Sequence, residues 1–200
     1  GGRFDAGMLY YCPQIWCSDD TDAFERTKIQ YGTSFIYPIS AVGSHVSVVP
    51  NHQTGRISPL ETRAVTAMAG SFGYELDLGL LTDEEKTAVA DQIRRFKNFG
   101  TLIHSGSYYR LTNPMNGNRA FWSYVSDDRS EALVHGMIYH APANMKRSAL
   151  RLSGLDENSL YSVNGTKETY SGAALMNGGI LLPMPWGDYT PVEINLKKVK

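Results

Sequence analysis

Acidic side chains cluster in one short segment near the start of the chain, Trp16-Cys17-Ser18-Asp19-Asp20-Thr21-Asp22. Carboxylates are among the groups that proteins use as general acids and general bases. These carboxylates come at the end of an apolar run at residues 13–18, which has the composition of a short strand. The segment therefore predicts acid or base chemistry at the point where a strand ends.

The three carboxylates are expected to have different roles. Asp22 and Glu25, three residues apart, match a capping box at the start of a helix. Acidic residues favour a helix N-terminus, so Asp20 and Asp22 are expected to stabilise that helix. Asp19 comes earliest and lies nearest the strand end. We therefore take Asp19 as the candidate catalytic carboxylate; the alternative is that it also only stabilises the helix.

Trp16, three residues before Asp19, is open to more than one interpretation. Its indole could offer an apolar face to a sugar ring or shield the acid from water, but a tryptophan in a strand also commonly belongs to the core. Cys12 and Cys17 flank it with four residues between them. Zinc sites favour closer cysteine pairs with further ligands nearby, so two free thiols are expected.

Strand and helix signals alternate over the first half of the chain. Strands are predicted at residues 13–18, 33–39 and 72–78, with a long polar loop over residues 44–56 that holds His45 and His52. Each histidine is expected at the rim of a site, at a subunit contact, or as a hydrogen-bonded loop residue. Helix starts are predicted at Asp22, at Ser58 with Pro59 and Glu61, and at Thr82 with Glu85. This alternation implies parallel strands joined by crossover helices, hence part of an α/β sheet or barrel.

The alternation of strand and helix signals ends at residues 113–118, Asn-Pro-Met-Asn-Gly-Asn, which form a cluster of turn-forming residues. Short apolar runs follow it, at residues 120–125, 131–140, 148–152 and 160–163. Asn164-Gly165 is a strong signal for a tight hairpin turn. We therefore expect a domain boundary at the turn-forming cluster, with residues 1–115 as part of an α/β sheet or barrel and residues 116–200 as an antiparallel β-sandwich domain. An eight-stranded barrel needs about 250 residues, so the missing strands are expected upstream.

Composition excludes several kinds of partner. Lys plus Arg number 19 and Asp plus Glu number 20, so no broad field would attract nucleic acid or an anionic membrane. No apolar run approaches the roughly 20 residues that cross a bilayer. The sequence contains no metal-ligand cluster and no nucleotide fingerprint, so no cofactor is expected. Because the chain opens on Gly1-Gly2 without a Met and lacks a disulfide framework, we expect a fragment of a cytoplasmic protein.

Several segments of this sequence carry a family resemblance: residues 1–11, 13–16 and 18–22, and downstream residues 28–37, 43–47, 50–56 and 72–77. Together they resemble the α-galactosidases of glycoside hydrolase family thirty-six. The resemblance covers most of residues 1–112. Over the β-rich tail it is looser and rests on the architecture and on Tyr139-His140.

The resemblance implies a function and several site residues. In that family a (β/α)₈ TIM barrel carries an aspartate nucleophile upstream and an aspartate general acid/base at the position of Asp19. The resemblance thus implies that residues 1–115 are the last β/α units of a TIM-barrel catalytic domain. The glycine-rich loop whose last members match Gly1 and Gly2 contacts the galactose. This implies a double displacement with retained configuration on raffinose-type or melibiose-type sugars, by a parent that is often a homo-oligomer. The chain alone, without its nucleophile, is expected to be inactive.

Other functions remain open at this stage. A relative on the same scaffold could transfer galactose to another sugar or prefer an N-acetylated sugar. The chain could also act as a noncatalytic sugar-binding or subunit-assembly module. An exposed row of aromatic side chains on the sandwich would favour that module, and its candidates are Tyr161, Tyr170, Trp186 and Tyr189.

Overall fold

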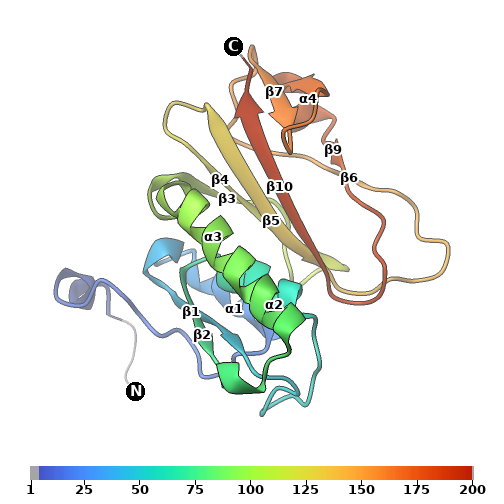
Figure 1. The fold of residues 1–200 in the computed structure, drawn as a ribbon. Helices are drawn as coiled ribbons and strands as arrows, with labels where there is room; N and C mark the ends of the chain where they lie inside the picture. Colours follow the sequence, from blue (N-terminus) through green and yellow to red (C-terminus); the bar gives the residue numbers. More distant parts are fainter. Residues whose placement is uncertain (1–4, 200) are drawn as a thin grey trace. The chain divides into compact units, whose positions relative to one another are not determined.

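A computed structural model describes residues 5–199 of the chain (Figure 1). Gly1 and Gly2, the expected galactose contacts, lie outside the described residues. The chain divides into two compact units, residues 1–98 and 99–200. This division falls inside helix α3 (Asp83–Ser105), whereas the sequence predicts the domain boundary after residue 115.

The first unit has parallel strands joined by helices. Its elements are η1 (Ala6–Tyr10), α1 (Ala23–Thr33), η2 (Ile39–Ala41), β1 (Gly43–Ser47), α2 (Leu60–Ala67), β2 (Ser71–Glu75), η3 (Leu78–Leu80) and the first part of α3. Strands β1 and β2 pair in parallel from Gly43↔Ser71 to Ser47↔Glu75, and Ile15 forms a parallel bridge with Val42. The predicted α/β alternation with parallel strands is therefore confirmed (Figure 1).

Two of the predicted strands differ from the structure. The run at residues 13–18 forms only the isolated bridge at Ile15, and the strand predicted at residues 33–39 is wrong. That stretch ends α1 and enters η2, and its side chains of Phe35 and Ile36 are 62% and 77% exposed. The strand lies instead at β1, inside the predicted polar loop. Its two serine side chains have partners, since Ser44 donates to the side chain of Gln30 at 2.8 Å and Ser47 to the carbonyl of Thr21 at 3.1 Å.

The helix starts were predicted with mixed success. Asp22 is the N-cap of α1 and accepts hydrogen bonds from the backbone of Phe24 and Glu25, as predicted. Thr82 and Glu85 form the predicted reciprocal capping box, with side chain to backbone distances of 2.9 and 3.2 Å. The predicted capping box at Ser58 is wrong, because α2 begins at Leu60 and has no side-chain cap.

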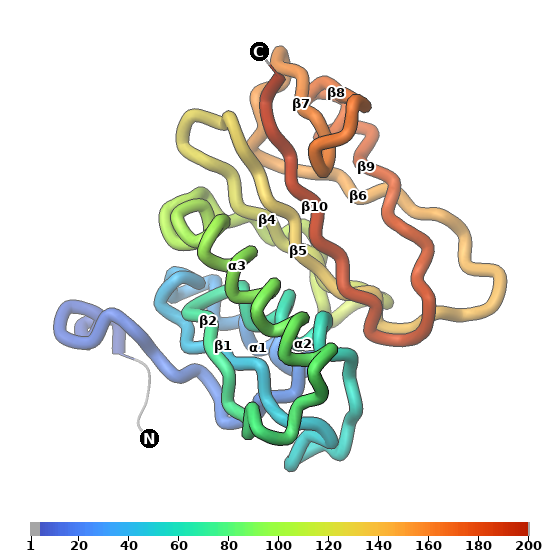
Figure 2. The backbone as a smooth tube through the Cα atoms, viewed as in Figure 1, coloured from blue at the N-terminus to red at the C-terminus, as the bar shows by residue number. Residues whose placement is uncertain are grey.

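The second unit is built on one antiparallel sheet of six strands in the order β3-β4-β5-β10-β7-β8. Its elements are β3 (Ser107–Arg110), β4 (Arg119–Val125), β5 (Glu131–Ile138), β6 (Ala149–Leu150), β7 (Leu160–Val163), β8 (Thr169–Ser171), α4 (Gly172–Asn177), β9 (Ile180–Leu181) and β10 (Thr190–Lys198). Figure 2 traces the excursion from β5 through β6 and the return through β9 to β10. Strands β6 and β9 form a separate small sheet.

The core of the second unit lies between the main sheet and the segment that carries β6, α4 and β9. One cluster joins sheet residues such as Phe121 and Leu196 to Leu150, Leu175 and Leu182 of that segment. The second unit thus combines two β layers with helix α4, and it is consistent with a β-sandwich. Burying one face of each layer against the other is what gives the unit an apolar core of its own.

The predicted turn at Asn164-Gly165 forms, but it lies within a longer loop, because the last paired residues of β7 and β8 are Ser162 and Thr169. Strands β7 and β8 pair antiparallel around it, and Thr166 donates its backbone N–H to Val163 at 2.9 Å. Asn164 and Gly165 have φ values of 49° and 68°, the left-handed pair that a type I′ turn requires. The turn type thus explains both residues.

The row of exposed aromatic side chains that would favour a binding module is not formed. Tyr161 is fully buried, whereas Tyr170 is 42% and Trp186 is 98% exposed. Tyr161 donates its hydroxyl to the carbonyl of Arg129 at 2.8 Å, which makes it a packing residue.

No helix within residues 5–199 is both long and apolar enough to span a bilayer. Across the same described range, no group of three histidine, cysteine or acidic side chains is placed to hold a metal ion. Cys12 and Cys17 are free thiols, as predicted.

Candidate active site

Asp19 lies in the loop between the bridge at Ile15 and helix α1, and its side chain is exposed. Its Oδ1 accepts a hydrogen bond of 2.8 Å from the indole Nε1 of Trp16. Its backbone carbonyl accepts a longer one, 3.4 Å, from the amide of Gln53. The candidate acid is thus held from two sides while its carboxylate stays open to solvent.

The two neighbouring carboxylates are engaged in local structure. Asp20 accepts the backbone N–H of Asp22 at 3.0 Å. Asp22 is 3% exposed and caps α1 through Oδ1, with distances of 2.8 Å to the N–H of Phe24 and 3.2 Å to that of Glu25. The assignment of these two residues to the helix start is confirmed. Asp19 is the one exposed carboxylate of the cluster.

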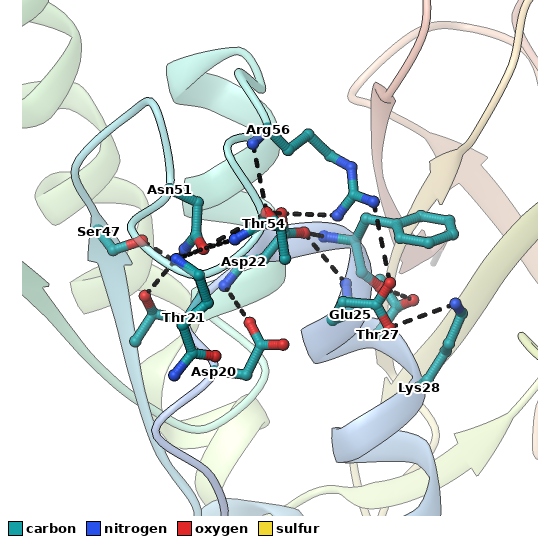
Figure 3. A network of polar contacts seen from close by, with 12 residues as sticks. Asp20, Thr21, Asp22, Glu25, Thr27, Lys28, Ser47, Asn51, Thr54 and Arg56 are labelled. Atoms are coloured by element: carbon teal, nitrogen blue, oxygen red, sulfur yellow. Dashed lines mark hydrogen bonds and ion pairs between the residues drawn. The ribbon is translucent and has the colours of Figure 1, made fainter.

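An ion pair fixes the buried carboxylate of Asp22. The guanidinium of Arg56 lies 2.6 Å from Oδ2, and the hydroxyl of Thr54 donates to the same oxygen at 2.5 Å (Figure 3). Burial alone would raise the pKa of Asp22, but the hydrogen bonds from Thr54, Arg56 and the backbone of Glu25, with the charge of Arg56, lower it below its ordinary value. Asp22 therefore stays ionised and cannot serve as a proton donor near neutral pH.

The loop after β1 is tied to the segment that carries Asp19. Asn51 donates its side-chain amide to the hydroxyl of Thr21 at 3.2 Å, and Ser47 donates to the carbonyl of Thr21 at 3.1 Å (Figure 3). Asn51 also accepts the backbone N–H groups of Gln53 and Thr54, each at 3.0 Å. These contacts, together with the Arg56 ion pair, join two loops that are far apart in the sequence.

The indole of Trp16 is packed as well as hydrogen bonded. Its ring stacks on His45 of β1 with centroids 5.1 Å apart and an interplanar angle of 30°. The guanidinium carbon of Arg26 lies 5.4 Å from the ring centroid. Arg26 is buried and donates to the carbonyls of Gly43 at 2.6 Å and Ser18 at 3.3 Å. Trp16 is still 39% exposed, so it is a partly open surface residue rather than core.

Sequence reasoning missed Arg56 and Thr54, and it placed His45 in a loop rather than in a strand. An arginine within a polar loop carries no sign of which of several carboxylates it will pair with. The stacking of His45 under Trp16 depends on β1, which the sequence did not reveal. Only the acidic cluster itself gave a usable signal.

The comparisons with known proteins cover both units. The family model named Melibiase matches residues 1–106, and the glycosyl hydrolase family 36 C-terminal domain matches residues 119–196. The bifunctional α-galactosidase/sucrose kinase AgaSK of Mediterraneibacter gnavus is 52% identical over the whole chain, which covers 21% of AgaSK. The α-galactosidase AgaA of Geobacillus stearothermophilus is also 52% identical over the whole chain, which covers 27% of AgaA.

Solved structures agree closely. The galactosidase domain of AgaSK superposes with a TM-score of 0.97 at 52% identity, over 99% of this chain and 28% of that one. A substituted variant of AgaA in complex with raffinose superposes with a TM-score of 0.95 at 50% identity, over 99% of this chain and 27% of that one. Together these matches define the class, the melibiase-type glycosyl hydrolases. Within it, the chain belongs to glycosyl hydrolase family 36 and matches the C-terminal portion of those proteins.

The chain spans about a quarter of the length of these relatives, 21% of one and 27% of the other. Retaining glycosidases use two carboxylates about 5 Å apart, and the site described here holds one exposed carboxylate, Asp19.

Proposed function

We propose that the chain is the C-terminal part of a retaining α-galactosidase that removes terminal α-linked galactose from raffinose-type and melibiose-type oligosaccharides. Asp19 is its general acid/base, and the nucleophile lies upstream of residue 1. The observation that most supports this proposal is that Asp19 is the exposed carboxylate of the acidic cluster. The chain around it is 52% identical in sequence to two α-galactosidases. One of these similar proteins has been solved with raffinose.

The fold supports this proposal in outline. The segment at Ile15, strand β1 and strand β2 run parallel and are joined through α1 and α2, which is how successive β/α units of a TIM barrel are built. Asp19 follows the first of these segments, at the end where barrel enzymes carry their catalytic groups. The second unit is the proposed C-terminal β-sandwich. The chain alone is inactive in this proposal, and the complete enzyme is a homo-oligomer.

The proposed reaction is a double displacement. The upstream carboxylate attacks the anomeric carbon while Asp19 gives its proton to the departing glycosidic oxygen. Asp19 then accepts a proton from the water that releases galactose, so the configuration is retained. Gly1, Gly2 and the exposed part of Trp16 are the proposed sugar contacts.

The decisive experiment replaces the acid in the full-length enzyme. Asp19→Ala should abolish turnover of melibiose, whose leaving group needs protonation, and retain glycosylation by an aryl α-galactoside with a good leaving group. Azide should then restore turnover of the aryl substrate by capturing the glycosyl-enzyme. Asp83→Ala is the matched control, since that carboxylate is 97% exposed at the start of α3. Near wild-type rates for Asp19→Ala on both substrates would show that Asp19 only supports the helix.

A further inference from the structure

The indole N–H of Trp16 is directed at the candidate acid itself. We propose that Trp16 is a positioning residue for Asp19, one that holds Oδ1 and leaves Oδ2 to carry the transferred proton. The inference rests on the proposed role of Asp19 as acid/base. It adds a second role for Trp16, separate from a contact between its ring and the sugar.

The contact is short and selective for one oxygen. Trp16 Nε1 lies 2.8 Å from Oδ1 of Asp19. Within residues 5–199, Oδ2 of Asp19 has no hydrogen-bond partner, and the side chain as a whole is exposed. One oxygen of the carboxylate is therefore fixed and the other is free to face a ligand.

The position of the indole is set by the two strands beneath it. His45 of β1 pairs in register with Gly73 of β2, and a Cβ at position 73 would lie only 2.8 Å from Cδ2 of His45. A Cβ at position 43 would likewise lie 3.0 Å from Cε3 of Trp16. The two glycines leave the space in which the His45 and Trp16 rings stack. Trp16 itself lies in the loop that follows the bridge at Ile15, but its ring is held against His45 of β1.

This geometry decides which oxygen holds the proton. An indole N–H is a donor only, so the oxygen that faces it must act as an acceptor. In the protonated acid that acceptor is the carbonyl-like Oδ1, which puts the proton on Oδ2. The proton leaves Oδ2 for the glycosidic oxygen as the C–O bond breaks, and the attacking water returns one to Oδ2 in the second step. The same oxygen serves both steps without rotation of the carboxylate.

The test uses Trp16→Phe in the full-length enzyme, which removes the N–H and keeps an aromatic ring on His45. The kcat/KM for melibiose should fall by roughly 10- to 100-fold, because protonation of the leaving group is impaired. The activated aryl α-galactoside has a good leaving group that does not need protonation. Its kcat/KM should therefore stay within about threefold of wild type. Trp186→Phe is the matched control, since Trp186 is 98% exposed.

Combination with Asp19→Ala separates this inference from the proposed function. Adding Trp16→Phe to Asp19→Ala should cause no further loss of kcat/KM for the aryl α-galactoside, since no carboxylate remains to be positioned. Equal losses of Trp16→Phe on both substrates would make Trp16 a sugar contact only, and unchanged rates on both would remove its role altogether. Either result overturns the inference about Trp16. The acid/base role of Asp19 is tested separately, by Asp19→Ala alone.

A second variant guards against misfolding at position 16. His45→Ala removes the ring beneath Trp16 without changing Asp19. It should also lower kcat/KM for melibiose more than for the aryl substrate, but by a smaller, several-fold factor. Loss of kcat/KM on the aryl substrate as large as on melibiose in this variant would contradict the positioning role.

Discussion

The two units bury different kinds of side chain. Among the described residues, 13 buried polar or charged residues belong to the first unit, from Thr21 to Gln92, and only Ser123 and His135 belong to the second. The second unit contains an apolar cluster of 15 buried residues. Apolar burial is a dependable source of stability, whereas buried polar groups stabilise only when each finds its partner.

The difference follows the location of the candidate chemistry. The polar interior of the first unit includes the contacts that hold the Asp19 loop, among them those of Asp22, Arg26 and Asn51. Hydrogen bonds and ion pairs fix direction as well as distance, which a catalytic carboxylate requires. We infer that the first unit uses its interior for precision and the second uses its interior for stability.

The largest expected effect tests the apolar interior of the second unit. Leu196 is fully buried in β10 and belongs to the apolar cluster. Leu196→Ala should lower the free energy of unfolding by about 3 kcal/mol, from lost transfer energy and the cavity left behind. Urea denaturation of the full-length protein measures it. Leu181→Ala, at a side chain that is 63% exposed, should change stability by less than about 0.5 kcal/mol.

A smaller loss is expected from the polar interior of the first unit. Asp22→Asn keeps a good N-cap residue but removes the charge that pairs with Arg56. It should lower the free energy of unfolding by about 2 kcal/mol, since a hydrogen-bonded charge is left without its partner. Asp83→Asn is the control at an exposed helix start. A loss no larger than that control would mean that the polar interior of the first unit is not organised by this ion pair.

The same ion pair predicts a pH dependence. The pKa of Asp22 is lowered in the folded protein, so its contribution is present above the unfolded pKa of about 3.9 and is lost as the pH falls through the lower folded value. The stability difference between wild type and Asp22→Asn should be constant from pH 7 to about 5 and shrink below about 4. Urea denaturation series at several pH values test this. A difference that persists unchanged at pH 2 would contradict the linkage.

Local signals in the sequence predicted the elements that local contacts stabilise. The Asn164-Gly165 turn, the Thr82 to Glu85 capping box and the Asp22 cap all form as predicted, because each is decided within a few residues. These features need no knowledge of the remaining chain.

Long-range contacts decided what the sequence did not show. Strand β1 has one strongly apolar residue, Val46, and its place is fixed by pairing with β2 and by side chains of other elements. Phe35 and Ile36 gave a strand signal yet lie exposed, since periodicity alone does not say what will cover them. Arg56 and Asp22, which form an ion pair, are 34 positions apart in the sequence.

The smallest expected effect concerns a carboxylate of the second unit that stabilises a surface turn. Hydrogen bonds from Ser159 at 2.5 Å, from Lys198 at 3.1 Å and from the backbone of Asn158 lower the pKa of Asp156 to about 2. Ser159→Ala should raise that pKa toward its ordinary value of 3.8, and Lys198→Met should raise it less, because the Ser159 hydroxyl is the largest cause.

Carboxyl carbon chemical shifts followed by NMR between pH 1.5 and about 6 measure these pKa values. Asp128 is the internal control, since its own pKa of about 2 depends on Ser126 and Ser130 and should not change in either variant. An unchanged pKa of Asp156 in Ser159→Ala would show that the hydroxyl does not set it. A confirmed shift would show that Asp156 of the second unit is stabilised by hydrogen bonds in a surface turn, whereas Asp22 of the first unit forms its hydrogen bonds at a buried position.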